Sequence, residues 1–469
     1  MLQNGEKNIP RCCFFSCSSL HAQLEHDEHV RDVLLVRLSY INEKISTFDE
    51  EYTMQSVLSR SSMNNLTKSV RNYNILIVGA GIAGPAFAYF LQRYGMRPVI
   101  VERASKLRLD GQTIDLRDEG KEIVRRMGIE SKIREKITHD QGVLMVDSQG
   151  RTRASFAVND IGENGYVAEI EILRGEFATI LYESTRDNAE YIFGDYPESI
   201  DDDGDQVQVK FGSGMTRKFD LVIGADGIHS KTRQLVFGNT PISYTDLYIA
   251  YFAIPVAESD SNWSRWYNAP GGRCIILRPD NQNMTRVLLF FRSKERGYER
   301  LDVDAQKSLL QKVFADAGFE ASRVLRDLSN TDNFYFDCAG QVKMDRWTRG
   351  RVALIGDAGY CPSLLTGMGT NMAFVGAYIL AGELARHRDY NEAFKQYEIL
   401  MRPYVAETQK LFPGYASAIT PKTRAGIAFR NAILSITSKP AVAPLLKKLL
   451  DGRTKKNFSL PDYETLIKD

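Results

Sequence analysis

Three glycines, Gly79, Gly81 and Gly84, have the spacing of a loop that binds the phosphates of a dinucleotide. Glycine permits a tight turn at the first position, the approach of a pyrophosphate at the second, and close packing of helix on strand at the third. Glu102 follows 18 residues after Gly84, where a carboxylate can accept hydrogen bonds from ribose hydroxyls. The pattern therefore predicts a site for NAD or FAD. Arg103, directly after Glu102, favours FAD.

The hydrophobic pattern indicates the elements that must position these residues. Residues 75–78 and 98–101 are continuous apolar runs, typical of strands that are buried on both faces of a parallel sheet. Residues 83–94 between them have helical periodicity, with Pro85 in the first turn and Gly95 as the terminating residue. The free amides and the positive dipole end of this helix would face the phosphates. The stretch therefore predicts one βαβ unit.

Later segments alternate between helical and strand patterns. Helices are predicted around 118–136 and 175–186, a strand at 220–225, antiparallel strands in 244–255 and 273–292, and helices at 371–387 and 390–412, with a kink at Pro403. Residues 358–382 form a run of 25 without charge, long enough for a membrane span. The several glycines of this run and Pro362 favour a buried turn followed by a buried helix instead.

Two further motifs carry a resemblance to a known family. They are LVIGADGIHSKTR at 221–233, and RVALIGDA at 351–358 followed by GMGTN at 367–371. With the glycine loop, they resemble the three fingerprints of single-component FAD-dependent monooxygenases of the para-hydroxybenzoate hydroxylase type, in order, over residues 73–400. The likeness is closest to the tetracycline-inactivating branch and its fungal and actinobacterial relatives.

The resemblance implies an α/β fold in which a Rossmann-like FAD-binding domain is interleaved with a mostly antiparallel β-sheet substrate domain and followed by C-terminal helices. The expected FAD-binding domain comprises residues 73–139, 166–240 and 340–395. The expected substrate domain comprises 140–165 and 241–339, and the C-terminal helical segment 396–469. The polar residues 1–72 predict a disordered N-terminal extension, or upstream sequence before a start at Met63.

The resemblance also implies flavin contacts. Arg108 and Asp115 lie in a segment similar to the loop that wraps the flavin, and Arg174 begins a helix similar to one whose arginine contacts FAD. Asp226 lies in a motif that serves both the fold and the pyrophosphate in the family. An alternative interpretation is that Asp226 holds its own loop together with Arg233.

Asp357 and the glycines after it indicate how the flavin ring would be held. Asp357 follows a buried strand, where its carboxylate can hold the ribityl hydroxyls; alternatively, it caps the helix that begins near residue 358. Gly369, Thr370 and Asn371 open a helix whose exposed amides can stabilise the anionic edge of reduced flavin. The chain departs from many relatives at Tyr360, which replaces a histidine, and at Gly376, which replaces an aspartate.

The activity implied by the resemblance is oxygenation. NADPH or NADH would reduce FAD, O2 would add at the flavin C4a position, and the hydroperoxide would deliver one oxygen atom to a small organic substrate, aromatic or polycyclic. The alternatives are an FAD-dependent oxidase or reductase that does not insert oxygen, and a non-catalytic FAD-binding protein.

Aromatic residues of 241–340 could line the substrate pocket or form a sheet core: Trp263, Trp266, Tyr267, Phe290, Phe291, Phe334, Tyr335 and Phe336. The sequence indicates no catalytic acid or base. His139 and His229 are predicted to be structural, and His387 to be solvated.

Composition limits the partners. Lys and Arg together number 60 against 59 Asp and Glu, a net charge of +1, whereas proteins that bind nucleic acid usually have a basic surplus. The six cysteines form neither a disulfide framework nor a credible metal site, so we expect a cytoplasmic monomer or homodimer without a metal. A basic amphipathic segment at 445–456 leaves peripheral membrane contact as an alternative.

Overall fold

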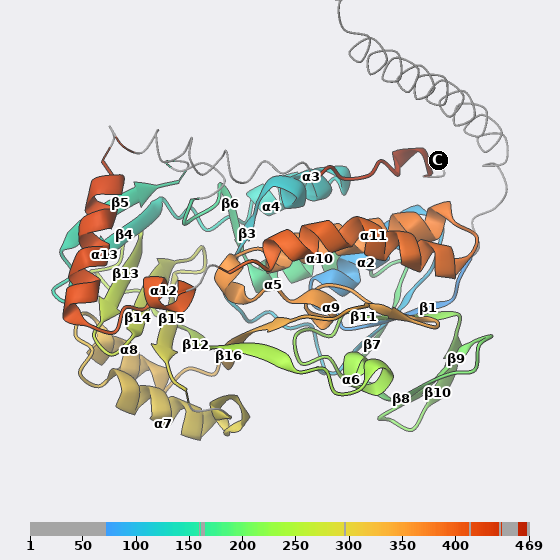
Figure 1. Cartoon of the computed structure of the whole chain (residues 1–469), viewed down its shortest axis with the longest axis horizontal. Helices are drawn as coiled ribbons and strands as arrows, with labels where there is room; N and C mark the ends of the chain where they lie inside the picture. Colours follow the sequence, from blue (N-terminus) through green and yellow to red (C-terminus); the bar gives the residue numbers. More distant parts are fainter. Residues whose placement is uncertain are drawn as a thin grey trace, which may run out of the picture. The chain divides into compact units, whose positions relative to one another are not determined.

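The computed structural model describes residues 72–158, 160, 165–294, 297–411, 414–439, 442 and 458–466. Residues 1–71, nearly the whole of the predicted N-terminal extension, lie outside these residues. The basic segment at 445–456 also lies outside them. The described chain forms two large sheets connected by a two-stranded ribbon, with helices against each (Figure 1).

The first large sheet has six strands in the order β17-β18-β11-β1-β2-β7. Its strands are parallel apart from the β17–β18 pair. They span β1 (Ile75–Val78), β2 (Val99–Glu102), β7 (Glu190–Phe193), β11 (Leu221–Gly224), β17 (Thr348–Arg349) and β18 (Val352–Leu354). All residues of β1 and β11 are buried, as the continuous apolar runs predicted.

The two faces of this sheet have different covers. Three helices, α2 (Ala83–Arg93), α5 (Arg174–Glu183) and α10 (Gly369–Arg386), pack over one face, with α11 (Tyr390–Thr408) outside α10 (Figure 1). The other face packs against a three-stranded sheet of β8 (Pro197–Asp202), β9 (Val207–Phe211) and β10 (Thr216–Phe219). This alternating arrangement of strands and covering helices is the predicted Rossmann-like unit.

The second large sheet has seven strands in the order β16-β12-β15-β14-β13-β4-β5. The neighbours are antiparallel except for β4 and β13. The strands span β4 (Gly142–Val146), β5 (Thr152–Ala157), β12 (Ile242–Pro255), β13 (Ser264–Ala269), β14 (Arg273–Pro279), β15 (Met284–Arg292) and β16 (Phe334–Val342). One face packs on α7 (Val303–Phe314) and α8 (Ala321–Leu328). The predicted fold class, two interleaved α/β and antiparallel units with C-terminal helices, is confirmed.

The remaining elements of the described chain are mostly short. They are β3 (Thr113–Leu116) paired with β6 (Ile170–Leu173), α3 (Asp118–Arg126), α4 (Glu130–Arg134), α6 (Lys231–Phe237), η2 (Tyr298–Arg300), α9 (Asp357–Tyr360), η3 (Leu364–Thr366), α12 (Tyr415–Ile419), α13 (Arg424–Thr437) and η4 (Glu464–Leu466). The prediction of one helix at 118–136 is wrong, because the chain turns at Gly128, whose φ of 68° is left-handed. Two helices, α3 and α4, result.

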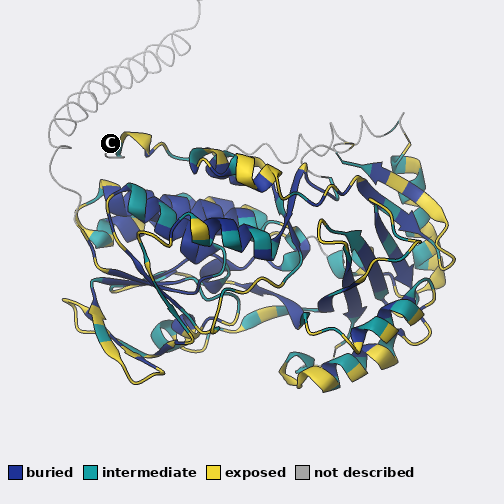
Figure 2. Cartoon of the chain, turned by 180° about the vertical axis from the view of Figure 1, so that it is seen from behind, coloured by how far each residue is buried: buried dark blue, intermediate teal, exposed yellow. Residues whose placement is uncertain are grey.

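The uncharged run at 358–382 is divided among α9, the η3 turn and α10. Helix α10 is buried from Asn371 to Ala385, and appears as the long dark helix above the parallel sheet in Figure 2. The prediction of a buried turn followed by a buried helix is therefore confirmed. Of the helices that the structure describes, none combines the length and apolar character needed to cross a membrane.

Candidate functional site

The glycine loop between β1 and α2 has no room for larger side chains at two positions. Gly79 has a φ of 110°, and a Cβ there would lie 2.6 Å from the carbonyl oxygen of Ala225. A Cβ on Gly84 would lie 2.0 Å from the carbonyl oxygen of Gly79. The loop thus passes close to the end of β11 and to its own helix, and glycine alone satisfies both approaches.

Glu102 is joined to the same loop by hydrogen bonds. The backbone amide of Ala80 donates to Oε2 at 2.9 Å, and the amide of Ala104 donates to Oε1 at 3.0 Å. The carboxylate therefore lies beside the first turn of α2, at the carboxyl end of β2, as the βαβ pattern predicted. The neighbouring Arg103 is exposed.

Arg174 lies where several of the predicted residues meet. A Cβ on Gly81 would lie 3.3 Å from its Nη2, and one on Gly111 would lie 3.0 Å from its Cδ. Burial lowers the pKa of Arg174, the positive charge of Arg108 lowers it further, and the carboxylates of Glu102 and Asp357 raise it. The structure therefore gathers these four charged residues, from four separate segments, around the glycine loop, with Arg108 on the exposed rim.

Asp357 begins α9, and the N-cap residue of this helix is Gly356. Burial raises the pKa of Asp357, while hydrogen bonding to Cys361 and the charge of Arg174 lower it. A Cβ on Gly369 would lie 3.8 Å from its Oδ1, so the start of α10 adjoins this carboxylate. The alternative in which Asp357 is the helix cap is wrong, and its carboxylate faces Arg174 and the beginning of α10.

Asp226 is bound within its own loop. Its carboxylate accepts hydrogen bonds from the Ser230 hydroxyl at 2.5 Å and from the backbone amide of Thr232 at 2.9 Å. Arg233 instead donates to the carbonyl oxygens of Ile228 and Ala358, at 2.6 and 2.9 Å. The alternative in which Asp226 holds its own loop together with Arg233 is therefore confirmed: Asp226 binds Ser230 and Thr232, and Arg233 binds the carbonyl oxygen of Ile228 in the same loop.

The side chains of Asp115 and Asn371 are occupied by contacts within the protein. Asp115 pairs with Arg117 at 2.7 Å. Asn371 is fully buried, and its Oδ1 accepts a hydrogen bond from the backbone amide of Arg117 at 3.1 Å. Asn371 thus ties the first turn of α10 to the chain after β3. Thr370, beside it, is partly exposed.

The two departures from the family pattern compensate for each other. A Cβ on Gly376 would lie 1.8 Å from the Tyr360 hydroxyl. The Tyr397 hydroxyl lies 3.0 Å from that of Tyr360 and donates to the carbonyl oxygen of Leu354 at 2.9 Å. The larger residue at 360 therefore fills the space that the glycine at 376 leaves.

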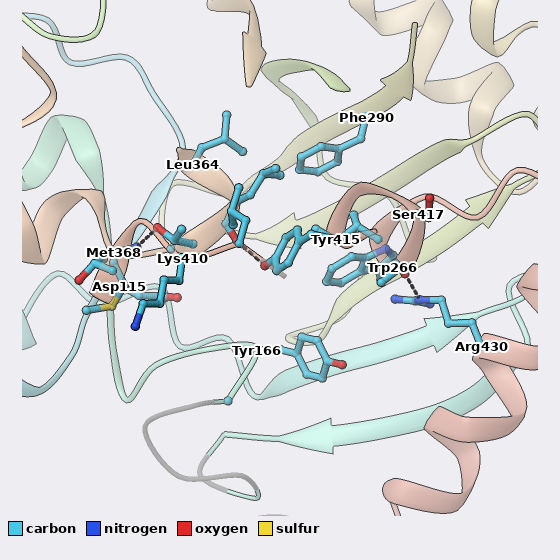
Figure 3. Close-up of a pocket in the computed structure, with 18 of the residues that line it drawn as sticks. Asp115, Tyr166, Trp266, Phe290, Leu364, Met368, Lys410, Tyr415, Ser417 and Arg430 are labelled. Atoms are coloured by element: carbon cyan, nitrogen blue, oxygen red, sulfur yellow. Dashed lines mark hydrogen bonds between the residues drawn. The ribbon is translucent and has the colours of Figure 1, made fainter. Parts of the chain in front are cut away.

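A cavity of about 1580 Å³ lies beyond the start of α10 (Figure 3). Its walls are the turn at 364–368, the face of the antiparallel sheet that carries Trp266 and Phe290, the chain around Asp115, and residues from 403–411 and 415–434 of the C-terminal segment. Of the eight aromatic residues that the sequence indicated, Trp266 and Phe290 line the cavity. Tyr267, Phe291 and Phe336 pack on the opposite face, against α7 and α8, because successive side chains of a strand point to opposite faces.

The sequence did not predict the C-terminal wall of the cavity. Helices were predicted there, but the sequence carries no sign that α12 and α13 cover the sheet. Tyr415 of α12 donates a hydrogen bond from its hydroxyl to the carbonyl oxygen of Leu365 at 2.5 Å. This contact joins the C-terminal segment to the turn before α10, and Figure 3 shows Tyr415 in the middle of the cavity wall.

Two histidines lie within hydrogen-bonding distance of carboxylates. His229 Nε2 lies 2.8 Å from Asp337 Oδ2, and the Tyr335 hydroxyl donates to the same oxygen at 2.9 Å. This contact joins the loop after β11 to β16, in keeping with a structural role. His387 lies 3.0 Å from Glu383 Oε2 and is only partly exposed. The prediction that His387 is solvated is therefore wrong, because the buried carboxylate of Glu383, one helical turn earlier, binds it.

Comparison with known proteins agrees with this geometry. A family model described as an FAD binding domain matches residues 72–408. A flavin-dependent monooxygenase of Legionella longbeachae is 39% identical over 405 residues, 84% of this chain and 99% of its own. The FAD-dependent monooxygenase asL6 of Sarocladium schorii is 34% identical over 418 residues, 84% of this chain and 98% of its own. The crystal structure of tetracycline destructase Tet(51) is similar, with a TM-score of 0.69 and 33% identity over 83% of this chain and 99% of that one.

The fold and these matches define an FAD-binding oxidoreductase. More specifically, the chain belongs to the family of FAD-dependent monooxygenases of the para-hydroxybenzoate hydroxylase type.

Proposed function

We propose that the chain holds FAD along the glycine loop, with the isoalloxazine ring at the turn before α10. The proposed contacts are Gly79, Gly81, Gly84, Glu102, Arg103, Arg108, Asp115, Arg174, Asp226, Asp357, Gly369, Thr370 and Asn371. The fit rests on the two glycines that exclude a Cβ and on the charged group around Arg174. The roles differ: Asp226 and Asn371 act through the loops that their side chains hold.

When bound, FAD would supply the redox chemistry, in which NADPH or NADH is the reductant, one atom of O2 is incorporated into a small organic substrate, and the other leaves as water. The residues of the chain supply the environment for this chemistry. The amides at the start of α10 can stabilise negative charge on the ring edge, and the aromatic face of the cavity can shield the reacting atoms from water. No residue of the chain is assigned as catalytic acid or base.

The observation that carries this proposal is the position of the large cavity. It adjoins both the turn before α10 and the aromatic face of the antiparallel sheet, so a substrate there would contact the flavin ring. Trp266 and Phe290 favour an aromatic or polycyclic substrate, because flat apolar faces bind one another well.

Labelled oxygen tests oxygenation against the alternatives. The purified FAD-loaded protein is supplied with NADPH or NADH, 18O2 and a panel of aromatic and polycyclic compounds, and the products are examined by mass spectrometry. A product two mass units heavier than under unlabelled O2 is expected. Substrate oxidation without incorporated label would indicate an oxidase or reductase. Tightly bound FAD together with NADPH or NADH consumption that no compound accelerates would indicate a non-catalytic FAD-binding protein.

A further inference from the structure

The end of the cavity farthest from the turn before α10 carries an arginine that packs on a tryptophan. Arg430 of α13 places its guanidinium carbon 5.3 Å from the centroid of the Trp266 ring. Its Nε donates to the carbonyl oxygen of Ala418 at 3.1 Å. Tyr166 lies edge-on to the same tryptophan, with ring centroids 5.8 Å apart. Figure 3 shows Arg430, Trp266 and Tyr166 together, on the opposite side from Met368 and Asp115.

A second arginine of the cavity wall reaches the same short helix. Arg292, at the end of β15, donates from Nη1 to the Ser417 hydroxyl at 2.8 Å, and its Nε is buried without a hydrogen-bond partner in the described part of the chain. Ser417 and Ala418 are consecutive residues of α12. This helix therefore holds two guanidinium groups at one part of the wall.

The charges at the two ends of the cavity differ in how they are balanced. Near the turn before α10, Asp115 pairs with Arg117 at 2.7 Å, and Glu407 with Lys410 at 2.6 Å. Within the described residues, no carboxylate pairs with Arg292 or Arg430. Burial lowers the pKa of Arg430, in keeping with a cation that is short of solvent. A buried charge is costly unless an opposite charge accompanies it.

We infer that this arginine pair, Arg292 and Arg430, binds an anionic oxygen of the substrate. The inference rests on the proposed function, because it names the class of molecule that the cavity takes: a ring-containing organic acid. The anion would be a carboxylate, or an enolate or phenolate that is ionised near neutral pH. Its rings would lie along Trp266 and Phe290 and extend towards the turn before α10. The arginine pair would thereby determine which end of the substrate lies at the flavin.

Binding of a matched pair of probes tests this inference without turnover. Anthraquinone-2-carboxylate and its methyl ester share one ring system and differ in charge. Both are titrated into the FAD-loaded protein by calorimetry, with no NADPH or NADH present. The acid is expected to bind at least about tenfold more tightly than the ester, since a hydrogen-bonded ion pair at an enclosed site contributes about that factor.

The arginines are then replaced singly. Arg430→Gln is expected to remove most of the preference for the acid and to change the ester affinity less than about twofold, since only the ion pair is lost. Arg292→Gln should also reduce the preference for the acid over the ester. This variant provides the test if Arg430→Gln does not fold. Arg424→Gln is the matched control, because Arg424 is exposed on the same helix and does not line the cavity; it should leave the preference unchanged.

Three results would overturn the inference. They are equal binding of acid and ester by the unaltered protein, equal weakening of both probes by Arg430→Gln and Arg292→Gln, and a loss of preference in Arg424→Gln as large as in Arg430→Gln. Because binding is measured without oxygen transfer, failure of the labelled-oxygen experiment leaves this result interpretable. Conversely, an oxygenase that prefers neutral substrates would keep the proposed function and lose the arginine site.

Discussion

The glycine loop and the cavity differ in what makes each of them specific. The loop depends on the absence of side chains, since a Cβ on Gly84 would lie 2.0 Å from a carbonyl oxygen that cannot move independently. The cavity wall depends on large side chains, such as Trp266 and Phe290, that come from distant strands and helices. A cofactor shared by a whole family can be held by a rigid backbone, whereas a substrate is distinguished by side chains, which can be exchanged with less disturbance of the fold.

The largest expected effect is at Gly84. The added methyl group of Gly84→Ala must push α2 away from β1, and strain of about 1–3 kcal/mol passed on to the cofactor site would weaken FAD binding by about 10–100-fold. Flavin absorbance of the purified protein, and titration with FAD, measure the effect. Gly95→Ala is the control, because Gly95, just after the same helix, has a φ of 83° but nothing within 4 Å of an added Cβ, so it reports backbone strain without a clash. A variant at Gly84 that retains FAD as well as this control would show that the tight packing is unimportant.

The next largest effect is expected at Tyr360 and Gly376, the two residues that differ from the family pattern. Gly376→Ala should lower the free energy of unfolding by about 1–3 kcal/mol, because the new methyl group overlaps the Tyr360 hydroxyl. In a Tyr360→Phe background, Gly376→Ala should lower the free energy of unfolding by clearly less. Denaturant unfolding of the four proteins in this cycle measures the coupling. Equal costs in both backgrounds would mean that the close contact is not the cause.

A change in the cavity wall should separate substrate oxidation from cofactor binding. Phe290→Leu keeps an apolar side chain but removes a flat ring, so NAD(P)H oxidation stimulated by an aromatic substrate should fall by about 3–10-fold, as expected for the loss of roughly 1 kcal/mol of aromatic contact. FAD content should stay unchanged. Parallel assays of stimulated NAD(P)H oxidation and flavin absorbance make the comparison. A loss of FAD would contradict the division between loop and cavity.

The smallest expected effect is at the contact between the two sheets. The hydrogen bond to Asp337 raises the pKa of His229, so the pair stabilises the fold fully below the unfolded pKa of about 6.5. This contribution is lost as pH rises through the higher folded pKa. His229 is about half exposed, so the difference in unfolding free energy from His229→Gln should be below about 1 kcal/mol. Urea unfolding of both proteins between pH 5 and 9 measures it, and a difference that grows with pH would contradict the assignment.

The elements around the loop were predictable from the sequence because each depends on neighbours in the chain. The apolar runs, the three glycines and Glu102 lie within 30 residues, and a strand that is buried on both faces needs no knowledge of what covers it. The boundary at Gly128 was missed because amphipathic periodicity continues across it, and a single left-handed residue is enough to divide the helix.

The cavity could not be predicted, because its wall depends on which face of each strand is covered. Residues 266 and 267, or 290 and 291, are equally aromatic in sequence, yet one of each pair lines the cavity and the other packs in the core. The register of the antiparallel strands decides this, and register is fixed by long-range pairing.

The sequence by itself thus indicated the cofactor and the family, since the glycine loop and the two later motifs are local patterns along the chain. The tertiary structure alone decided what lies opposite the proposed flavin site. Helices α12 and α13, more than 300 residues after the loop, bring Tyr415 and Arg430 to the sheet. Nothing in the local sequence encodes that contact, because its energy comes from burying surfaces that meet only in the folded chain.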